Sequence, residues 1–259
     1  MELTLYQIDA FANKPFEGNP AAICPLNEWL SDEIMQSIAT ENNLSETAYF
    51  VKNNNGYHIR WFTPAHEVNL CGHATLASAY VIFNILESKE QEITFESKSG
   101  LLTVKRNNAW LQMDFPSQPP VRCEMPQQIL EAFDETPVEC LKSEDYIVVF
   151  ENEETILNSK PKLSLLSELD LRGVAITSKS KKYDFVTRFF APKYGINEDP
   201  VTGSAFTQLI PYWSDKLNKN TLNAKQVSNR GGEVKCIHSG ERVTISGEAV
   251  KYMVGTIEI

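Results

Sequence analysis

Arg60-Trp61-Phe62-Thr63-Pro64, followed by Gly72-His73-Ala74-Thr75-Leu76-Ala77, is the stretch that decides the fold, because a similar stretch recurs half a chain later. The second copy reads Arg188-Phe189-Phe190-Ala191-Pro192, followed by Gly203-Ser204-Ala205-Phe206-Thr207. Self-similarity at so long a period is typical of a duplicated domain and not of a short-repeat solenoid. We therefore expect two matched halves that bring the same structural device to one shared cleft.

The length and the repeat together indicate two domains. A chain of 259 residues can form one large domain or two smaller ones, and the repeat favours two. We place the N-terminal half at residues 1–116 and the C-terminal half at 117–247, with the last strand, about 248–259, able to return to the first half. The proline-rich segment 116–120 is the expected linker, because prolines stiffen the path between domains.

Composition excludes several classes of function. The net charge is −10, and no stripe of lysine and arginine is present that could neutralise phosphates, so we expect no nucleic-acid partner. The longest apolar stretch, residues 76–86, is interrupted by polar residues and is too short to cross a membrane, and the N-terminus does not read as a signal peptide. We therefore expect a soluble, cytoplasmic protein.

The sequence predicts neither a metal nor a cofactor. The five cysteines are an odd number without a Cys-x-x-Cys pair, which is typical of free thiols in a reducing compartment. The closest candidate zinc set, His66, Cys71 and His73, lacks the paired short spacings of structural zinc sites. Glycine-rich nucleotide-binding motifs are absent as well.

The pattern of elements favours an α+β protein, in which each half is a curved β-sheet around a central helix. Strands outnumber helices and do not alternate with them one to one, which argues against a doubly wound nucleotide-binding fold. The helix that begins after Ser31 should bury Ile34 and Ile38, with Met35 as a further candidate, and residues 15–20 should form a loop. The expected helices are 31–43, 72–86, 126–133 and 204–217, and the expected strands are 3–9, 21–24, 44–51, 57–62, 93–96, 101–105, 109–114, 146–150, 173–177, 185–190 and a hairpin over 242–259.

Both copies of the repeat place small residues at the start of a helix, at Gly72 and at Gly203. The first turn of a helix carries unpaired N–H donors and a partial positive charge, which attract a carboxylate or a phosphate. Two matched helix starts therefore predict a clamp for one small anion. The alternative is that the two glycines only cap their helices.

Three titratable residues accompany the repeat. Alternation along residues 44–51 puts Glu46 on an apolar face with Ala48, where burial would suit the carboxylate to proton transfer; a carboxylate that faces solvent or pairs with lysine is the alternative. His73 lies at a positive helix end, which should lower its pKa and keep it neutral. Asp199 precedes the second helix and either caps it or aligns a histidine.

The chain resembles the phenazine-biosynthesis PhzF-like family. The stretches that carry the resemblance span nearly the whole chain in order and read Asp9-Ala10-Phe11, Gly18-Asn19-Pro20-Ala21-Ala22, Asn43-Leu44-Ser45-Glu46-Thr47-Ala48, Leu70-Cys71-Gly72-His73-Ala74-Thr75, Asp199-Pro200-Val201-Thr202-Gly203-Ser204-Ala205 and Gln226-Val227-Ser228-Asn229-Arg230-Gly231-Gly232. The resemblance implies the diaminopimelate-epimerase fold, with the active site between two pseudo-symmetric halves, and a homodimer. It also implies a cofactor-independent isomerase.

The resemblance also implies roles for individual residues. Glu46 matches the family's acid/base, which moves a proton on a small carboxylic acid (in the name-giving member, a cyclic diene acid), and His73, Asp199 and Ser204 match its supporting residues. The residues that we expect to bind the substrate are Asn19, Ser45, Gly72, Thr202 and Gly203.

Two departures from related patterns leave alternatives open. Thiol racemases of this fold use two cysteines; Cys71 occupies the first place, but the region around Asp199 has no thiol, which favours transfer through Glu46 alone. Many relatives carry histidine where this chain has Phe206, which leaves the substrate open. The alternative functions are a non-catalytic small-carboxylate-binding protein and a thiol-dependent epimerase that uses Cys71.

Overall fold

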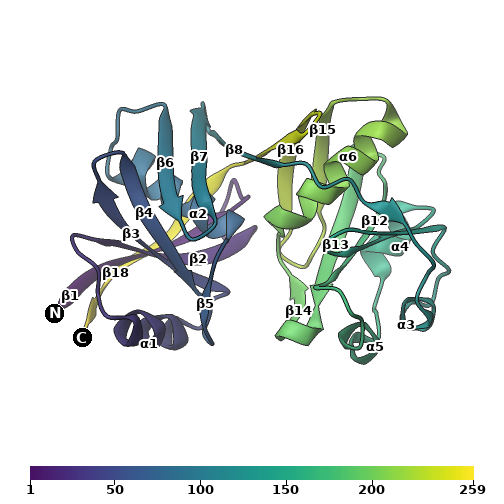
Figure 1. Cartoon of the computed structure of the whole chain (residues 1–259), viewed down its shortest axis with the longest axis horizontal. Coiled ribbons are helices and arrows are strands. Elements are labelled where there is room, and N and C mark those ends of the chain that lie inside the picture. The colour runs from purple at the N-terminus through teal and green to yellow at the C-terminus, as the bar shows by residue number, and fades with distance from the viewer. The chain divides into compact units, whose positions relative to one another are not determined.

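The computed structural model describes all residues, 1–259, and divides them into two compact units (Figure 1). Unit 1 comprises Met1–Asp114 and Ser246–Ile259, and unit 2 comprises Phe115–Ile245. The chain passes between the units within two strands, β8 (Trp110–Pro116) and β17 (Arg242–Gly247). Both units are mixed α and β structures, which confirms the predicted fold class.

Unit 1 is a curved sheet with one helix inside it and one outside (Figure 1). Besides β8, its strands are β1 (Glu2–Ala10), β2 (Asn19–Leu26), β3 (Glu46–Asn53), β4 (Gly56–Phe62), β5 (Glu67–Val68), β6 (Glu92–Ser97), β7 (Gly100–Asn107) and β18 (Ala249–Glu258). Its helices are α1 (Asp32–Asn42) and α2 (Gly72–Tyr80), the latter continued by a π-helical turn, Val81–Ile85.

Unit 2 repeats this plan with additional short helices. Besides β17, its strands are β9 (Val121–Arg122), β10 (Glu139–Lys142), β11 (Tyr146–Val149), β12 (Val174–Lys179), β13 (Phe185–Ala191), β14 (Ile196–Asp199), β15 (Thr221–Gln226) and β16 (Gly232–Ser239). Its helices are α3 (Gln127–Ala132), α4 (Glu153–Asn158), α5 (Leu163–Ser167) and α6 (Phe206–Leu217), with 3₁₀ turns at Pro192–Tyr194 and Gly203–Ala205.

The same series of strand pairings occurs in both units. In unit 1, β2 pairs in parallel with β3, β3 pairs antiparallel with β4, and β4 pairs antiparallel with β5 and in parallel with β6. In unit 2, β11 to β15 are joined by the same relations in the same order. The repeat in the sequence therefore corresponds to a repeat of the whole supersecondary pattern.

Each unit has its central helix buried on nearly all sides. In α2 every residue from His73 to Ala79 is buried, and in α6 every residue from Phe206 to Ser214 is buried. A helix that is surrounded in this way belongs to the core and not to the surface. Thr75 and Ser78 remain compatible with burial because their hydroxyls donate to the carbonyl oxygens four residues earlier.

The expected linker is fixed to unit 2 instead of being loose. Pro211 inside α6 has no N–H, so the carbonyl oxygen of Thr207 lacks its usual helical donor. The backbone N–H of Gln118 donates to that oxygen at 3.0 Å, and Gln118 Oε1 lies 2.7 Å from the Thr207 hydroxyl. The N–H of Ser117 donates to the Glu241 carbonyl oxygen at 2.8 Å. The proline-rich segment is therefore a strap across α6.

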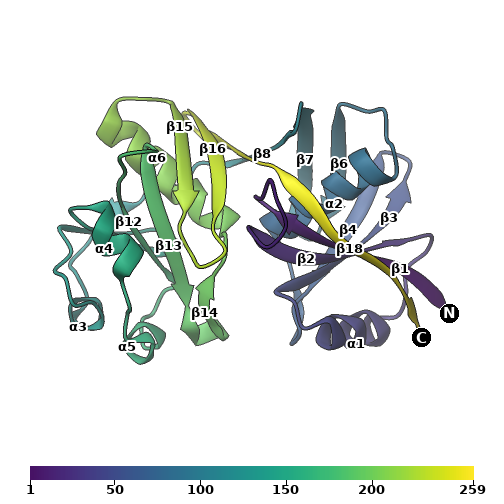
Figure 2. The same cartoon turned by 180° about the vertical axis from the view of Figure 1, so that it is seen from behind.

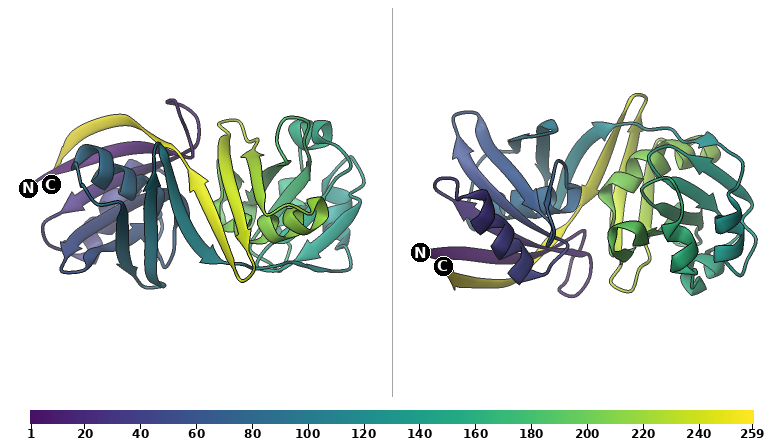
Figure 3. Two further views of the ribbon diagram at one scale, coloured as in Figure 1. Left: turned by 90° about the horizontal axis from the view of Figure 1, so that it is seen from above. Right: turned by 60° about the horizontal axis from the view of Figure 1, so that its bottom comes forward.

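The C-terminal strand pairs with the N-terminal strand of unit 1, so the predicted hairpin over residues 242–259 is wrong, whereas a return of the last strand to the first half was expected. β18 runs antiparallel to β1 from Glu2 opposite Glu258 to Ala10 opposite Ala249. The N-terminal amino group donates to the carbonyl oxygen of Ile259, and the two ends lie together in Figures 2 and 3. Alternating side chains predicted a strand, but could not identify its partner.

Three smaller expectations also fail. Ile34 is exposed, whereas Ile38 is buried as predicted and Met35 is buried beside it on α1. The predicted loop over residues 15–20 ends at Gly18, because Asn19 already begins β2. The second repeated helix starts with a 3₁₀ turn at Gly203, and regular α-helix begins at Phe206. None of the helices has the length and apolar character needed to cross a membrane.

Candidate functional site

Each copy of the repeat contains an arginine that forms an ion pair with a glutamate on the strand before the glycine, and we call this ion pair the clip. In unit 1, Arg60 of β4 holds Glu67 of β5 through two hydrogen bonds of 2.8 and 2.9 Å. In unit 2, Arg188 of β13 holds Glu198 of β14 through bonds of 2.7 and 2.9 Å. Paired bonds of this kind fix orientation as well as distance. The hydrogen bonds from Arg60 lower the pKa of Glu67 to about 2, so the clip is fully charged at neutral pH.

The clip aligns the two copies residue by residue. Counting from Glu67 and Glu198, Gly72 matches Gly203. Cys71 then matches Thr202, and His73 matches Ser204, so the positions on either side of the glycine differ between the units. The three additional residues of the second copy lie before Glu198. The two units therefore share the arginine–glutamate ion pair and the glycine, but they differ in the side chains on either side of that glycine.

In unit 1 the structure brings Glu46 and His73 together. Glu46 is the first residue of β3, and its Oε2 lies 3.1 Å from Nε2 of His73, near the start of α2. Only 16% of the Glu46 side chain and 8% of the His73 side chain are exposed. Neither buried atom makes an aligned hydrogen bond, although the distance is that of an ion pair. Both groups can therefore take a third partner, as a bound substrate would require.

The argument from alternation that singled out Glu46 does not hold in the structure. Residues 47 to 50 of β3 are all buried, so both faces of this strand are covered, and alternation does not distinguish them. Tyr49, for example, donates to the carbonyl oxygen of Met35 in α1 on the opposite side from the apolar face that we assigned to Glu46. Glu46 is special because it starts the strand at the edge where α2 also starts.

Cys71 completes this group beside the imidazole ring. Its sulfur lies 3.6 Å from His73 Nδ1, while Glu46 faces Nε2. The ligand atoms of the three residues lie within 4.8 Å of one another, and their types are those that bind zinc. The sulfur and the carboxylate therefore lie near each other as well as near the ring. His66, which we had considered with Cys71 and His73, is not part of the group.

The pKa of His73 moves in the direction opposite to our prediction. Burial alone would lower it, but the negative charges of Cys71, when ionised, and of Glu46 outweigh burial and raise the pKa of His73 well above its usual value. The positive end of α2 would lower the pKa of His73, but the neighbouring negative charge outweighs it. We attribute the direction to Glu46, since burial and the charge of Glu46 raise the pKa of the Cys71 thiol and keep it protonated at neutral pH.

We expect the raised pKa of His73 to appear in the pH dependence of stability. A histidine with a raised folded-state pKa contributes stability that is complete below the unfolded pKa of about 6.5 and is lost as the pH rises through the folded value. His73→Gln should therefore flatten the fall in unfolding free energy above about pH 6.5. Urea unfolding at a series of pH values measures this, with the exposed His66→Gln as a control. An unchanged pH dependence in His73→Gln would contradict the assignment.

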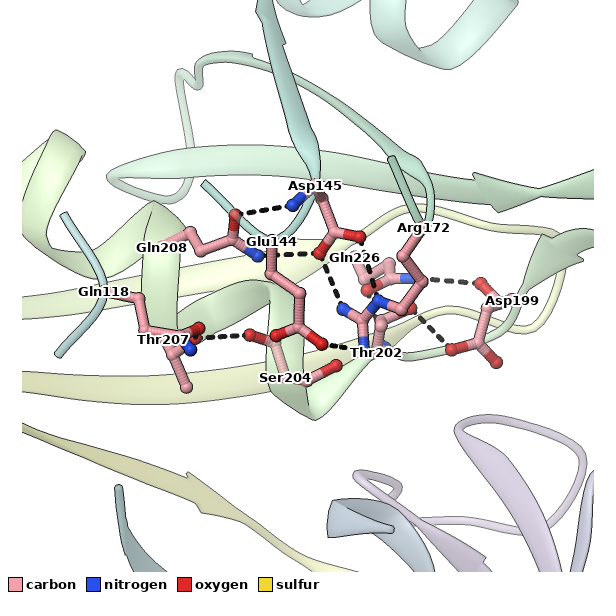
Figure 4. Close-up of polar contacts among 10 residues, drawn as sticks. All are labelled: Gln118, Glu144, Asp145, Arg172, Asp199, Thr202, Ser204, Thr207, Gln208 and Gln226. Carbon is pink, nitrogen blue, oxygen red and sulfur yellow. Dashed lines mark hydrogen bonds and ion pairs between the residues drawn. The ribbon is translucent and has the colours of Figure 1, made fainter. Parts of the chain in front are cut away.

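In unit 2 the predicted residues form a second group (Figure 4). Asp199 ends β14, and its Oδ2 accepts a hydrogen bond of 2.5 Å from the Thr202 hydroxyl. Gln226 of β15, which is completely buried, donates to the Asp199 carbonyl oxygen at 2.7 Å and accepts from the Thr202 N–H at 2.9 Å. Ser204 is half-buried in the 3₁₀ turn, and its carbonyl oxygen accepts from Thr207. The turn that carries Asp199 and Ser204 is thus held rigidly.

A buried ion pair beneath this turn was not predicted from the sequence. Asp145 is completely buried and accepts two bonds, of 2.9 and 2.6 Å, from Arg172 (Figure 4). Gln208 of α6 donates to the same carboxylate at 2.6 Å and accepts from the Asp145 N–H at 3.0 Å. The pair therefore anchors α6 just after Ser204. Its sequence signal was an acidic residue directly before the apolar strand β11.

The alignment of the two units shows that Glu46 has no counterpart. Thr47 lies opposite Phe62 in unit 1, and Val174 lies opposite Phe190 in unit 2, so the residue that matches Glu46 is Gly173. A Cβ atom at Gly173 would lie 2.5 Å from the ring of Phe189 and 2.9 Å from the carbonyl oxygen of Phe190. A side chain is therefore excluded at this position without rearrangement. At the matched strand starts, only unit 1 provides a carboxylate.

The predicted substrate-binding residues fall at the same edges. Asn19 starts β2 and is completely buried, and Glu46 starts the neighbouring parallel strand β3. Ser45 directly precedes β3 and is exposed. Gly72 begins α2 and is partly exposed, whereas Thr202 and Gly203 are buried in the turn before α6. Asn19, Glu46, Gly72 and His73 thus belong to unit 1, and Asp199, Thr202, Gly203 and Ser204 to unit 2.

Comparison with known proteins gives a consistent result. The model of the phenazine biosynthesis-like protein family (PhzC-PhzF) matches residues 8–255. A protein of Pseudomonas aeruginosa named an uncharacterized isomerase is 51% identical over 259 residues, which is 100% of both chains. The crystal structure of a PhzF-family protein from Enterococcus faecalis matches with a TM-score of 0.98 at 44% identity, over 100% of each chain. A probable proline racemase from Agrobacterium radiobacter has a TM-score of 0.67 at 9% identity, over 99% of this chain and 93% of its own, and shares the fold.

Proposed function

Because the chain belongs to the phenazine biosynthesis-like family, we propose that it is a cofactor-independent isomerase that moves a proton on a small carboxylic acid, with Glu46 as the acid/base. The observation that carries the proposal is the pairing of a half-buried Glu46 with a buried His73 at the start of α2, without an aligned hydrogen bond between them. A carboxylate held in this state can accept a proton from a substrate and give it back. The name isomerase on a relative with 51% identity supports the same reaction class.

The proposed reaction is a proton transfer in two steps. Glu46 removes a proton from a carbon that conjugation makes acidic, and the electron pair moves into the conjugated system. Glu46 then returns the proton to another carbon, so that the product has the same atoms as the substrate. His73, with its raised pKa, carries a positive charge beside Glu46 and limits the build-up of negative charge during the first step.

The substrate carboxylate would be bound by the duplicated motif. We propose that N–H groups at Gly72–His73 and at Gly203–Ser204 hold one carboxylate, because the first N–H groups of a helix lack partners within that helix. Asp199, positioned by Thr202 and Gln226, would accept from an amine or hydroxyl of the substrate. The repeat in the sequence supports matched roles for the two motifs.

A thiol-dependent epimerase agrees less well with these contacts. Burial raises the pKa of the Cys71 thiol, and the thiolate is the form that would act as a base. The position that matches Cys71 in unit 2 is Thr202, whose hydroxyl donates a hydrogen bond to Asp199. An enzyme that used one base on each face of its substrate would need a second ionisable group there.

Proton exchange in D₂O, followed by NMR, tests the proposal directly. We would incubate the protein with dihydro-hydroxyanthranilate and with other small conjugated acids. Exchange or isomerisation of any of them supports the isomerase. Saturable binding of such acids without any exchange would instead identify a small-carboxylate-binding protein and would reject the proposal.

A further inference from the structure

We propose that Cys71 is a positioning residue for His73: its sulfur holds the imidazole ring through Nδ1 and thereby directs Nε2 toward Glu46 and the substrate. The inference deepens the proposed function and rests on it, since the orientation of His73 matters for catalysis only if Glu46 transfers a proton. Cys71 would neither form a covalent bond nor carry the substrate proton itself.

The position of Cys71 is fixed independently of its sulfur. Cys71 is the residue before α2, and its carbonyl oxygen accepts from both the N–H and the hydroxyl of Thr75, at 3.1 and 2.6 Å. Its side chain does not cap the helix, as a serine or threonine at this position usually would. Instead the sulfur lies 3.6 Å from His73 Nδ1, within hydrogen-bond distance for sulfur. The side chain is therefore available to His73.

A thiol can serve His73 in both of its charge states. When the ring is neutral and carries its proton on Nε2, the S–H group can donate to Nδ1. When the ring is charged, Nδ1–H can donate to the sulfur. A residue beside a proton-transfer group needs this ability, because the charge of that group changes during the reaction. An alkyl side chain would leave Nδ1 buried without a partner in both states.

The second unit provides an independent parallel. Thr202 matches Cys71, and its hydroxyl donates to the carboxylate of Asp199 at 2.5 Å. In each unit, the residue directly before the glycine therefore contacts that unit's own titratable group. The chemistry of the contact differs, a thiol with imidazole and a hydroxyl with carboxylate, but the position is the same. This agreement favours positioning over a base function for Cys71.

The other ionisable groups near α2 have partners of their own or face away. The strands packed against α2 include β1, β2, β3 and β18. Asp9 of β1 accepts from the N–H of Phe16, and Cys24 of β2 lies in the cluster that packs on α1. Lys251 and Glu258 of β18 are exposed. Cys71 and Glu46 are thus the ionisable groups that directly contact His73.

Titration of His73 by NMR tests the inference without any substrate. The full chain would be labelled at its four histidines, with the His73 signal assigned by its loss in His73→Gln. In Cys71→Ala we expect the His73 midpoint to fall by about 0.5 pH unit, because the bond from the charged ring to the sulfur is stronger than the bond from the neutral S–H group to Nδ1. Cys71→Ser should restore part of the shift, because its hydroxyl also donates and accepts. Cys24→Ala, which removes another buried thiol of unit 1, should leave the midpoint unchanged.

Two results would overturn the inference. One is an unchanged His73 midpoint in a folded Cys71→Ala protein. If that variant does not fold, the wild type decides: above its midpoint, the ¹⁵N shifts should show the Nε2–H tautomer with Nδ1 hydrogen-bonded, and a free Nδ1 would reject the inference. Because no substrate is used, failure here is distinct from failure of the proposed reaction, which the exchange experiment in D₂O reports separately.

Discussion

Glu46→Gln should reduce the turnover number about 10³-fold, while the affinity for the substrate changes little. The amide has nearly the same shape as the carboxylate but cannot accept a proton, so binding contacts survive and the chemical step does not. The side chain is only partly exposed, so water would not easily substitute for the lost base. Rates of proton exchange in D₂O, measured over a range of substrate concentrations, separate the two effects.

The control for this variant is Glu41→Gln, which makes the same change at an exposed position of α1. It should exchange protons at the wild-type rate. The proposed function would be wrong if Glu46→Gln kept its rate within a few-fold. A second consequence follows from the ion pair: the loss of the Glu46 charge should lower the pKa of His73, and this shift is measurable by NMR even without a substrate.

Arg172→Met should destabilise the protein by about 3–5 kcal/mol, because it leaves the carboxylate of Asp145 buried without a compensating charge. Asp145 is 0% exposed, and two of its bonds come from Arg172. Gln208 alone cannot neutralise it. Urea unfolding followed by circular dichroism measures the loss, and the transition of unit 2 should move most.

A double variant separates the effect of charge from the effect of packing. Asp145→Asn together with Arg172→Met removes both charges and should recover part of the stability lost in Arg172→Met. Lys105→Met is the control, because its ion pair with Glu92 lies on the surface, and it should cause no measurable change. Wild-type stability in Arg172→Met would mean that Asp145 is reached by water.

The fold was predictable from the sequence because its main signals are local or repeated. The helices that begin near Ser31 and Gly72 have clear starts, and the repeat of Arg60 and Gly72 at Arg188 and Gly203 indicated two matched units. Local signals do not determine which strands pair. For this reason the partner of β18 and the contacts of the proline-rich strap could be found only in the structure.

The sequence predicted which residues belong to the candidate site better than it predicted how their charges affect one another. The resemblance to the PhzF-like family indicated Glu46, His73, Asp199 and Ser204, and the structure places the first two in contact. It could not indicate that the Glu46 carboxylate lies close enough to His73 to reverse the direction of the histidine's pKa shift. The shift depends on an approach between residues from β3 and α2, and such an approach is a property of packing.

The pairing of β18 with β1 also determines the order in which the chain can be completed during synthesis. Unit 2 is a continuous segment, Phe115–Ile245, that lies between the two segments of unit 1 in the chain. Unit 1 needs residues 249–258 to cover the edge of β1, and these are synthesised after all of unit 2. Domains usually fold from the N-terminus onward during synthesis. In this protein unit 1, which holds the reactive pair of Glu46 and His73, is completed only after unit 2 has been synthesised.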